Sequence, residues 1–249
     1  MHLRRRLWEA LIRAIRPRLD LTYTARSGLA CGLRRRGGLG FLPGRPLTPE
    51  ERWLAAQPWA GKVVYDVGAW EGVFTLFFAR AVGQVGAVVA FEPNPQSVAR
   101  ARENVALNGF TNVCVLEVAL GADNGSAWLD TPTGVAARGR LSAVPTALAV
   151  SVRRLDSLLA EAKLPAPDFI KLDVEGAELA VLHGSELVLE RCRPVLLIEV
   201  HPETQATALL PFLSSLGYDL HCVEARKTVR CEGDLPALDE VWHLAALPY

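Results

Sequence analysis

The chain alternates short apolar runs with amphipathic segments from residue 62 to its end. A run such as PVLLIEV, residues 194–200, is typical of a strand buried on both faces of a sheet. The pattern predicts strands at 62–67, 87–92, 113–119, 168–174, 194–200, 218–224 and 239–246, and helices at 73–82, 95–107, 177–190 and 203–216. Because such short alternation favours parallel strands with right-handed crossovers, we predict an α/β fold. It would be a Rossmann-like doubly wound three-layer sandwich with a mainly parallel sheet.

Two regions interrupt this alternation. Residues 26–49 are rich in Gly, Pro and Arg, which suits a linker or an irregular lid. Asn124-Gly125 is typical of a hairpin turn and predicts a short antiparallel excursion, after which residues 132–150 are predicted to be irregular. A length of 249 residues suits one α/β domain. We therefore predict an N-terminal arm and linker over 1–49 and one domain over 50–249.

The N-terminal arm carries much of the basic charge. Residues 1–50 hold 11 Arg, no Lys and three acids, so the rest of a chain with zero net charge is acidic. The body therefore lacks a basic surface for nucleic-acid phosphates, and no nucleic-acid partner is expected. Apolar residues at helical spacing within 3–19 predict a basic amphipathic helix. Docking on the body, or on a second subunit to form a homodimer, is favoured over binding to an anionic membrane surface.

The sequence indicates neither secretion nor a disulfide framework. Glu9, Arg13 and Arg16 interrupt the apolar core that a signal peptide would need. No apolar run approaches the roughly 20 residues of a membrane span. The five cysteines form an odd set without CxxC spacing. We therefore expect a cytoplasmic protein.

The turn in VYDVGAWEGVFTLFFAR, residues 64–80, follows the first predicted strand, where an open parallel sheet binds nucleotides. It lacks the middle glycine of a dinucleotide-binding GxGxxG turn and the lysine of a phosphate loop. Asp66 and Glu71 add negative charge, which repels phosphate and suits an ammonium or sulfonium group. Glu92 ends the next strand, in AFEPNP, where an acid would accept both hydroxyls of a ribose. These residues predict a site for a cationic nucleoside.

Six segments occur in the order found in FkbM-type S-adenosylmethionine-dependent methyltransferases, a family that the chain resembles from about residue 62 to 202. The segments are VYDVGAWEG, AFEPNPQSVARARENVALNG, LEVALG, RRLDSLL, DFIKLDVEGAELAVLHGSELVL and RPVLLIEVHP. The resemblance implies the class I methyltransferase fold, a seven-stranded sheet with one antiparallel strand near its edge. It also implies S-adenosylmethionine as cofactor and a hydroxyl of a sugar or natural product as acceptor.

The resemblance further implies a set of cofactor-binding residues. The candidates are Asp66, Gly68, Ala69, Gly72, Glu92, Asn94, Glu117 and Ala119. The glycines of the turn would let the backbone approach the methionine part, with Asp66 near its ammonium and Glu92 at the ribose. Residues 117–119 would contact the adenine. Trp70 stands where many relatives carry Asn.

Four titratable residues end two predicted strands that should be neighbours: Asp173 and Glu175 in IKLDVEGAE, and Glu199 and His201 in LLIEVHP. Methyl transfer to a hydroxyl needs in-line positioning and a general base, and Asp173, Glu175 or His201 could each be that base. We favour Asp173. Glu175 could instead begin a helix, and His201 could satisfy a loop hydrogen bond. Oxygen ligands for a divalent metal are plentiful here, but no metal-specific spacing is present, so no metal is predicted.

The sequence therefore predicts an S-adenosylmethionine-dependent O-methyltransferase that acts on a hydroxylated small molecule. An NAD-type oxidoreductase is one alternative, since it shares the fold and the ribose acid, although the pyrophosphate glycines are missing. A non-catalytic nucleoside-binding module recruited through its N-terminal arm is the other.

Overall fold

The structure is a computed structural model that describes residues 21–37, 46–130, 139–142, 144–145, 148–162, 164–201, 206–234 and 241–249. The amphipathic helix predicted within residues 3–19 lies outside these ranges. Within them, no helix combines the length and the apolar character that crossing a membrane requires.

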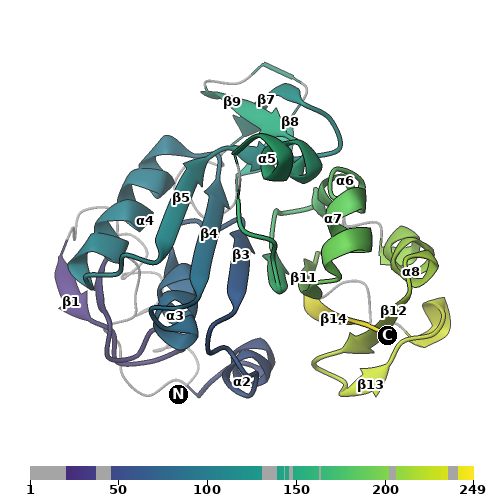
Figure 1. The fold of residues 1–249 in the computed structure, drawn as a ribbon, viewed down its shortest axis with the longest axis horizontal. Coiled ribbons are helices and arrows are strands. Elements are labelled where there is room, and N and C mark those ends of the chain that lie inside the picture. The colour runs from purple at the N-terminus through teal and green to yellow at the C-terminus, as the bar shows by residue number, and fades with distance from the viewer. Residues whose placement is uncertain are drawn as a thin grey trace, which may run out of the picture.

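In the described part of the chain, the central sheet has eight strands in the spatial order β13-β12-β14-β11-β10-β3-β4-β5 (Figure 1). Their bounds, in that order, are Lys227–Thr228, Tyr218–Cys222, Trp242–Pro248, Val195–Val200, Phe169–Leu172, Val63–Val67, Ala87–Glu92 and Val113–Glu117. The five strands from β11 to β5 are parallel, and β14 runs antiparallel between β11 and β12. The chain order reverses between β3 and β10. The predicted mainly parallel, doubly wound sheet is confirmed, with the two-residue β13 added at its edge.

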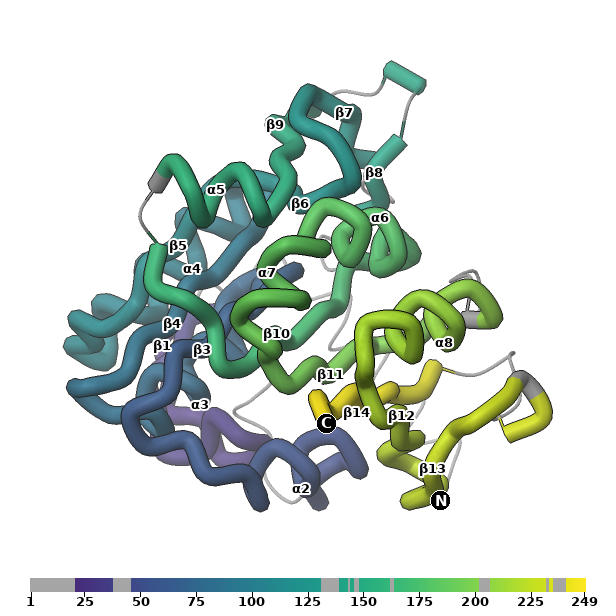
Figure 2. Tube along the Cα trace, turned by 45° about the vertical axis from the view of Figure 1, so that its right-hand side comes forward, coloured from purple at the N-terminus to yellow at the C-terminus, as the bar shows by residue number. Residues whose placement is uncertain are grey.

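Helices cover both faces of this sheet (Figure 2). One face carries α2 (Pro49–Ala55), α3 (Val73–Val82) and α4 (Pro95–Leu107). The other carries α5 (Leu155–Ala162), α6 (Glu178–His183), α7 (Glu186–Cys192) and α8 (Ala206–Ser215). Because strand side chains alternate, Val88 and Ala90 of β4 pack toward α3 and α4, and Val89 and Phe91 pack into the opposite core. The predicted three-layer arrangement is therefore present.

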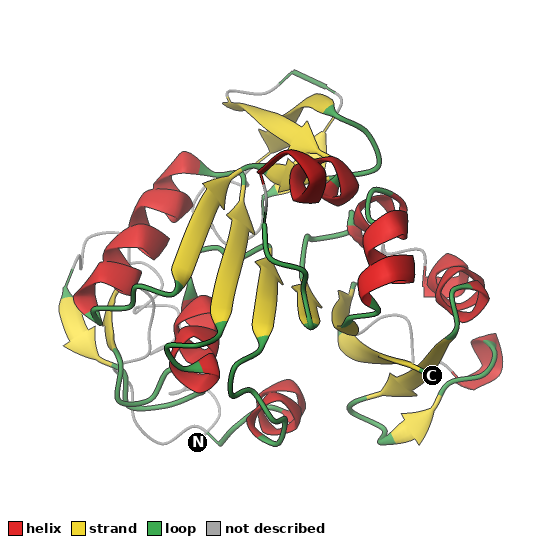
Figure 3. Cartoon of the chain, viewed as in Figure 1, coloured by secondary structure: helices red, strands yellow, loops and turns green. Residues whose placement is uncertain are grey.

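A second, smaller sheet lies beyond the arrowheads of β4 and β5 (Figure 3). It contains, in spatial order, β6 (Ala119–Leu120), β9 (Leu148–Arg153), β7 (Gly125–Asp130) and β8 (Arg140–Ser142). β7 is antiparallel to both β8 and β9, which confirms the predicted excursion. The hairpin turn predicted at Asn124-Gly125 is wrong, because the flanking strands β6 and β7 each pair with β9 instead of with each other.

The irregular structure predicted over 132–150 is also wrong where β8 and the start of β9 form. The segment LAVSVR of β9 has the apolar–polar alternation of a strand, but the Gly and Pro residues before it obscured that pattern. β9 is held between two neighbours, β6 and β7. Part of the small sheet, namely β8 and the start of β9, is therefore built from a segment whose composition is typical of a loop.

Residues 21–37 are folded onto α4. β1 (Thr22–Thr24) and β2 (Arg34–Arg36) pair antiparallel. Asn104 accepts a hydrogen bond from the backbone N–H of Arg36 at 2.7 Å, and Asn108 accepts one from that of Arg34 at 2.9 Å. The linker or irregular lid predicted over 26–49 is therefore wrong at 34–36, which form β2, because side chains at the end of α4 satisfy backbone groups of this strand that would otherwise be left to water.

The helix predicted over 177–190 is divided into α6 and α7 around Gly184. A Cβ atom at Gly184 would lie 1.9 Å from the carbonyl oxygen of Gly121, so only glycine fits this contact. Asp156 accepts hydrogen bonds from the N–H groups of Leu187 at 3.3 Å and Val188 at 3.0 Å. These groups belong to the first turn of α7, so Asp156 stabilises the start of that helix.

Candidate active site

A pocket opens at the carboxyl ends of β3, β4 and β10, where the strand order reverses. Open parallel sheets bind their ligands at this place. The lining residues are Val67, Gly68, Trp70, Phe91, Glu92, Pro93, Asn94, Val118, Ala119, Leu120, Leu129, Gly139, Leu141, Asp173, Val174 and Glu175. They include six of the predicted site residues: Gly68, Glu92, Asn94, Ala119, Asp173 and Glu175. The lining does not include the other five: Asp66, Ala69, Gly72, Glu117 and His201.

Glu92 is held in one orientation at the end of β4. One carboxylate oxygen accepts a hydrogen bond from the N–H of Trp70 at 2.8 Å, and the other accepts one from that of Asn94 at 2.9 Å. Each oxygen keeps a further lone pair, so the carboxylate can still accept two hydroxyl groups. Burial raises the pKa of Glu92, and the two backbone hydrogen bonds oppose that shift. The side chain of Asn94 itself caps α4 by accepting from Gln96 and Ser97.

The turn over residues 68–72 packs tightly against neighbouring segments of the chain. A Cβ atom at Gly68 (φ +83°) would lie 1.7 Å from the carbonyl oxygen of Asp173. Only glycine therefore allows the turn after β3 to pack this closely against the chain that follows β10. A Cβ atom at Gly72 (φ +80°) would lie 3.3 Å from that of Ala101 on α4. Both glycines therefore have packing roles that do not depend on a ligand.

Asp66 lies beneath the turn, outside the pocket lining. Its side chain is buried and accepts a hydrogen bond from the Thr75 hydroxyl at 2.5 Å. Burial raises the pKa of Asp66, while the nearby Lys171 ammonium opposes the shift. Asp66 thus organises the turn from inside the protein. Contact with a ligand's ammonium, which the family resemblance implies, stays a prediction.

Asp173 combines a place in the pocket with a perturbed pKa. Its carboxylate lies 3.1 Å from Nζ of Lys171, two residues earlier on the same face of β10. Burial raises the pKa of Asp173 to about 7, and Glu199 acts in the same direction while Lys171 opposes it. A carboxylate with a pKa near neutrality can accept a proton from a reacting group.

His201 lies among three carboxylates. Its Nε2 atom is 3.4 Å from Glu175 and 3.4 Å from Glu199, and its Nδ1 atom is 3.3 Å from Glu178. Burial would lower the pKa of His201, but bonds to Glu178 and Glu199 raise it to about 10. An imidazolium cannot accept a proton, so this geometry favours a charge-compensating role for His201 over that of the base.

Glu175 is not the residue that begins the helix. The carboxylate of Glu178 accepts hydrogen bonds from the N–H groups of Val174 at 3.3 Å and Gly176 at 3.1 Å. Glu175 adopts a left-handed backbone conformation (φ +54°), and its carbonyl accepts a hydrogen bond from Arg140 of the small sheet. Glu175 is therefore part of the pocket lining and not the start of a helix.

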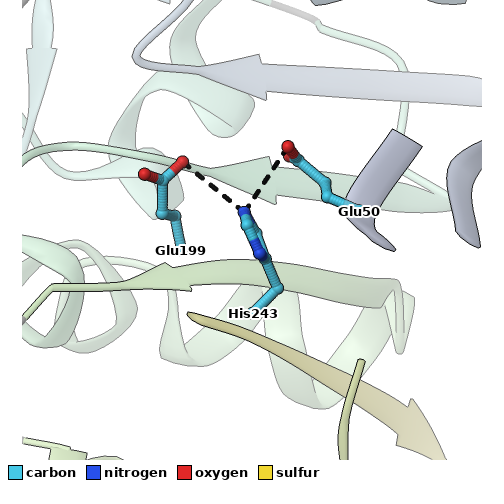
Figure 4. A group of neighbouring side chains, drawn as sticks. All are labelled: Glu50, Glu199 and His243. Atoms are coloured by element: carbon cyan, nitrogen blue, oxygen red, sulfur yellow. Dashed lines mark ion pairs between the residues drawn. The ribbon is translucent and has the colours of Figure 1, made fainter. Parts of the chain in front are cut away.

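Three further titratable residues, which the sequence pattern did not predict, lie close to Glu199 and outside the pocket lining: Glu50, Glu224 and His243. His243 lies opposite Glu199 in the antiparallel pairing of β11 and β14. Figure 4 shows its Nε2 atom between Glu50 and Glu199, at 3.5 Å and 3.6 Å. The one sequence signal was a histidine inside the apolar strand WHLAALP. Glu50, in the first turn of α2, gave no signal, because acids are common at helix starts.

The known proteins and the family model that this chain resembles are methyltransferases. Residues 66–220 match the Methyltransferase FkbM domain, which confirms the resemblance predicted from the sequence. The hexuronic acid methyltransferase AglP of Haloferax volcanii is 31% identical over 141 residues. That alignment covers 56% of this chain and 56% of AglP, so the chain spans about half the length of this relative. The crystal structure of methyltransferase FkbM from Methylobacillus flagellatus KT has a TM-score of 0.53 at 18% identity, covering 77% of this chain and 45% of that one.

Proposed function

Because this chain belongs to the FkbM methyltransferase family, we propose that it transfers a methyl group from S-adenosylmethionine to a hydroxyl of a sugar or another small natural product. The observation that carries this proposal is a pair of carboxylates in one pocket, at the ends of different strands. Glu92 has lone pairs for ribose hydroxyls, and Asp173 has a pKa suited to accepting a proton.

The pocket suits a sulfonium nucleoside better than a dinucleotide. Among its described lining residues there is no Lys or Arg to neutralise a diphosphate, and Glu92, Asp173 and Glu175 are all acids. Their charge attracts a cation and repels phosphate. Glu92 would hold the ribose, and Ala119 lies on the wall where the adenine is expected. When bound there, S-adenosylmethionine supplies an electrophilic methyl group.

Asp173 would act as the general base. It removes the proton from the acceptor hydroxyl, which makes the oxygen a better nucleophile, and a positioned base typically contributes ~10²–10⁴-fold. The ammonium of Lys171, 3.1 Å away, stabilises the carboxylate form of Asp173 before the transfer. The positive charge of His201 offsets part of the negative charge of Glu175 and Glu199.

A sugar is the favoured acceptor because AglP, by its name, methylates a hexuronic acid. We also place the protein in the cytoplasm, without a nucleic-acid partner. We propose that its N-terminal arm docks on the body, or on a second subunit to form a homodimer, in preference to a membrane surface. The acidic character of the body supports the absence of a nucleic-acid partner.

Ligand binding separates this proposal from an NAD-type oxidoreductase. S-adenosylhomocysteine at about 100 times its dissociation constant should stabilise the protein by ~2.7 kcal/mol, which is measured as a rise in melting temperature. NAD should produce no rise. Stabilisation by NAD and none by S-adenosylhomocysteine would overturn the cofactor assignment.

Turnover separates the proposal from a non-catalytic binding module. The protein is incubated with S-adenosylmethionine and a panel of neutral sugars, uronic acids and hydroxylated natural products. Formation of S-adenosylhomocysteine that depends on one acceptor supports the enzyme. Cofactor binding without transfer to any member of the panel would favour the binding module.

A further inference from the structure

We propose that Glu50, Glu199 and His243 form a binding site for one divalent transition-metal ion, such as Zn²⁺, next to the rim of the pocket. Three separate elements bring the residues together: the first turn of α2, the end of β11 and the start of β14. Their ligand atoms, one from each residue, all lie within 4.8 Å of one another. Imidazole nitrogen and carboxylate oxygen are both ligands that such an ion takes in proteins.

The spacing of these atoms fits ligands better than hydrogen-bond partners. His243 Nε2 lies 3.5 Å from Glu50 Oε2 and 3.6 Å from Glu199 Oε2, beyond a normal hydrogen bond (Figure 4). Two ligands of a tetrahedral ion with bonds of about 2.0–2.1 Å are roughly 3.4 Å apart. The distances from His243 Nε2 to the two carboxylates therefore match those between ligands of one ion, and the third pair of ligand atoms, those of Glu50 and Glu199, lies within 4.8 Å.

One buried polar atom at this gap, Nε2 of His243, has no hydrogen-bond partner among the described residues. The side chains around it are largely buried, with 12% of His243 and 9% of Glu50 exposed. Buried polar atoms are nearly always satisfied, and an ion at the gap would satisfy Nε2 of His243.

Glu224 orients the imidazole toward the gap. Its Oε1 atom lies 2.7 Å from Nδ1 of His243, and its Oε2 atom accepts the backbone N–H of the same residue at 2.9 Å. With the proton held on Nδ1, the lone pair of Nε2 faces Glu50 and Glu199. A carboxylate behind a histidine in this way is the usual second partner of a metal-binding imidazole.

The charges around the gap also favour a cation. Three carboxylates, those of Glu50, Glu199 and Glu224, surround His243. Two cationic groups offset part of this charge: Nζ of Lys171 lies 3.6 Å from Oε1 of Glu50, and Nε2 of His201 lies 3.4 Å from Oε1 of Glu199. Both contact Oε1 atoms, so the Oε2 atoms of Glu50 and Glu199 are available to an ion. The competing occupant is a proton on Nε2, which would make His243 an imidazolium shared by two carboxylates.

A second group, Asp173, Glu199 and His201, also places three ligand atoms close together. It is less suited to an ion because the ammonium of Lys171 already lies 3.1 Å from Asp173. The two groups share Glu199. Its Oε1 atom lies 3.4 Å from His201, so an ion on its Oε2 atom would fix the carboxylate between the two histidines.

Metal binding to the full chain tests this site without reference to activity. The protein is treated with a chelator, dialysed and titrated with Co²⁺ by visible absorption, and then with Zn²⁺ by competition. We expect one equivalent per chain, with the visible band of four- or five-coordinate Co²⁺ that Zn²⁺ abolishes. Absence of stoichiometric binding of either ion overturns the proposal and leaves His243 with a proton.

Variants locate the ion. His243→Ala and Glu50→Gln should abolish the band, and Glu224→Gln should weaken affinity by roughly 10–100-fold, because it removes the partner behind the imidazole. His183→Ala is the matched control, since His183 is paired with Glu186 on the surface away from the rim. If a variant does not fold by circular dichroism, Zn²⁺-dependent shifts of the His243 ring resonances in the unaltered protein decide. Binding that survives His243→Ala and Glu50→Gln, or unshifted His243 resonances, would overturn the assignment.

Discussion

Replacing Glu92 by Gln tests the cofactor assignment at its best-defined residue. Glutamine keeps the volume of the side chain but removes its charge and replaces one acceptor oxygen by an NH₂ group. In the structure both oxygens of Glu92 already accept backbone hydrogen bonds, at 2.8 and 2.9 Å. The variant therefore cannot keep the geometry of the turn and also accept two ribose hydroxyls.

The expected magnitude follows from the hydrogen bonds that are lost. A hydrogen bond to a charged group contributes roughly 1.5–3 kcal/mol, and each 1.4 kcal/mol is tenfold in affinity. Loss of one ribose contact should thus weaken binding of S-adenosylhomocysteine by about 10- to 100-fold. Isothermal titration calorimetry of the purified variant measures this change directly, and its melting temperature without ligand shows whether it is folded.

Glu190→Gln is the matched control. Glu190 is an exposed residue of α7 and lies outside the pocket lining. Its substitution should change affinity by less than about twofold. Unchanged affinity in a folded Glu92→Gln variant would refute the reasoning, and equal losses in both variants would indicate a general effect of charge instead of a ribose contact.

Three further substitutions test other parts of the account. Asp173→Asn should lower turnover by ~10²–10⁴-fold, while the affinity for S-adenosylhomocysteine stays within a few fold of that of the unaltered protein. Turnover close to that of the unaltered protein would show that another residue is the base. Gly68→Ala should lower the melting temperature more than Gly83→Ala, because both glycines have positive φ but only Gly68 meets a backbone oxygen, at 1.7 Å. Equal losses would contradict the packing role of Gly68. Asp156→Ala should cost about 1 kcal/mol in urea unfolding through loss of the bonds to α7, whereas Asp123→Ala, at an exposed site, should cost little. A loss at Asp156 no larger than at Asp123 would rule out the cap.

The strands and the acids at their ends were predictable from the sequence. Apolar runs mark buried parallel strands, and in such a sheet the residues that follow the strands meet at one edge. This rule placed Glu92 and Asp173 at the same edge, and the structure puts both in one pocket. The reasoning needed only the position of each acid relative to its own strand.

Features that depend on contacts distant in sequence were not predictable. His243 reaches Glu199 through an antiparallel pairing, and Glu50 reaches the same place from the start of α2. Neither contact produces a periodic pattern in the sequence. Gly184, between α6 and α7, packs against the backbone of Gly121, and the local sequence does not reveal this contact.

Local composition was misleading where tertiary contacts supply hydrogen-bond partners. Residues 26–37 have the composition of a linker, but Asn104 and Asn108 bind the backbone of β2. Asp66 is the converse case. Its charge beside the turn and the family resemblance predicted contact with a ligand's ammonium, which stays a prediction. The local sequence did not reveal that its carboxylate is buried against Thr75 beneath the turn.

The most direct test of the central claim is transfer of a ¹³C-labelled methyl group. The protein is incubated with methyl-¹³C S-adenosylmethionine and a hydroxylated acceptor, and the product is examined by NMR spectroscopy. The account predicts a new O-methyl resonance that requires both the acceptor and Asp173. A labelled methyl on nitrogen or carbon, or a signal undiminished in Asp173→Asn, would contradict it.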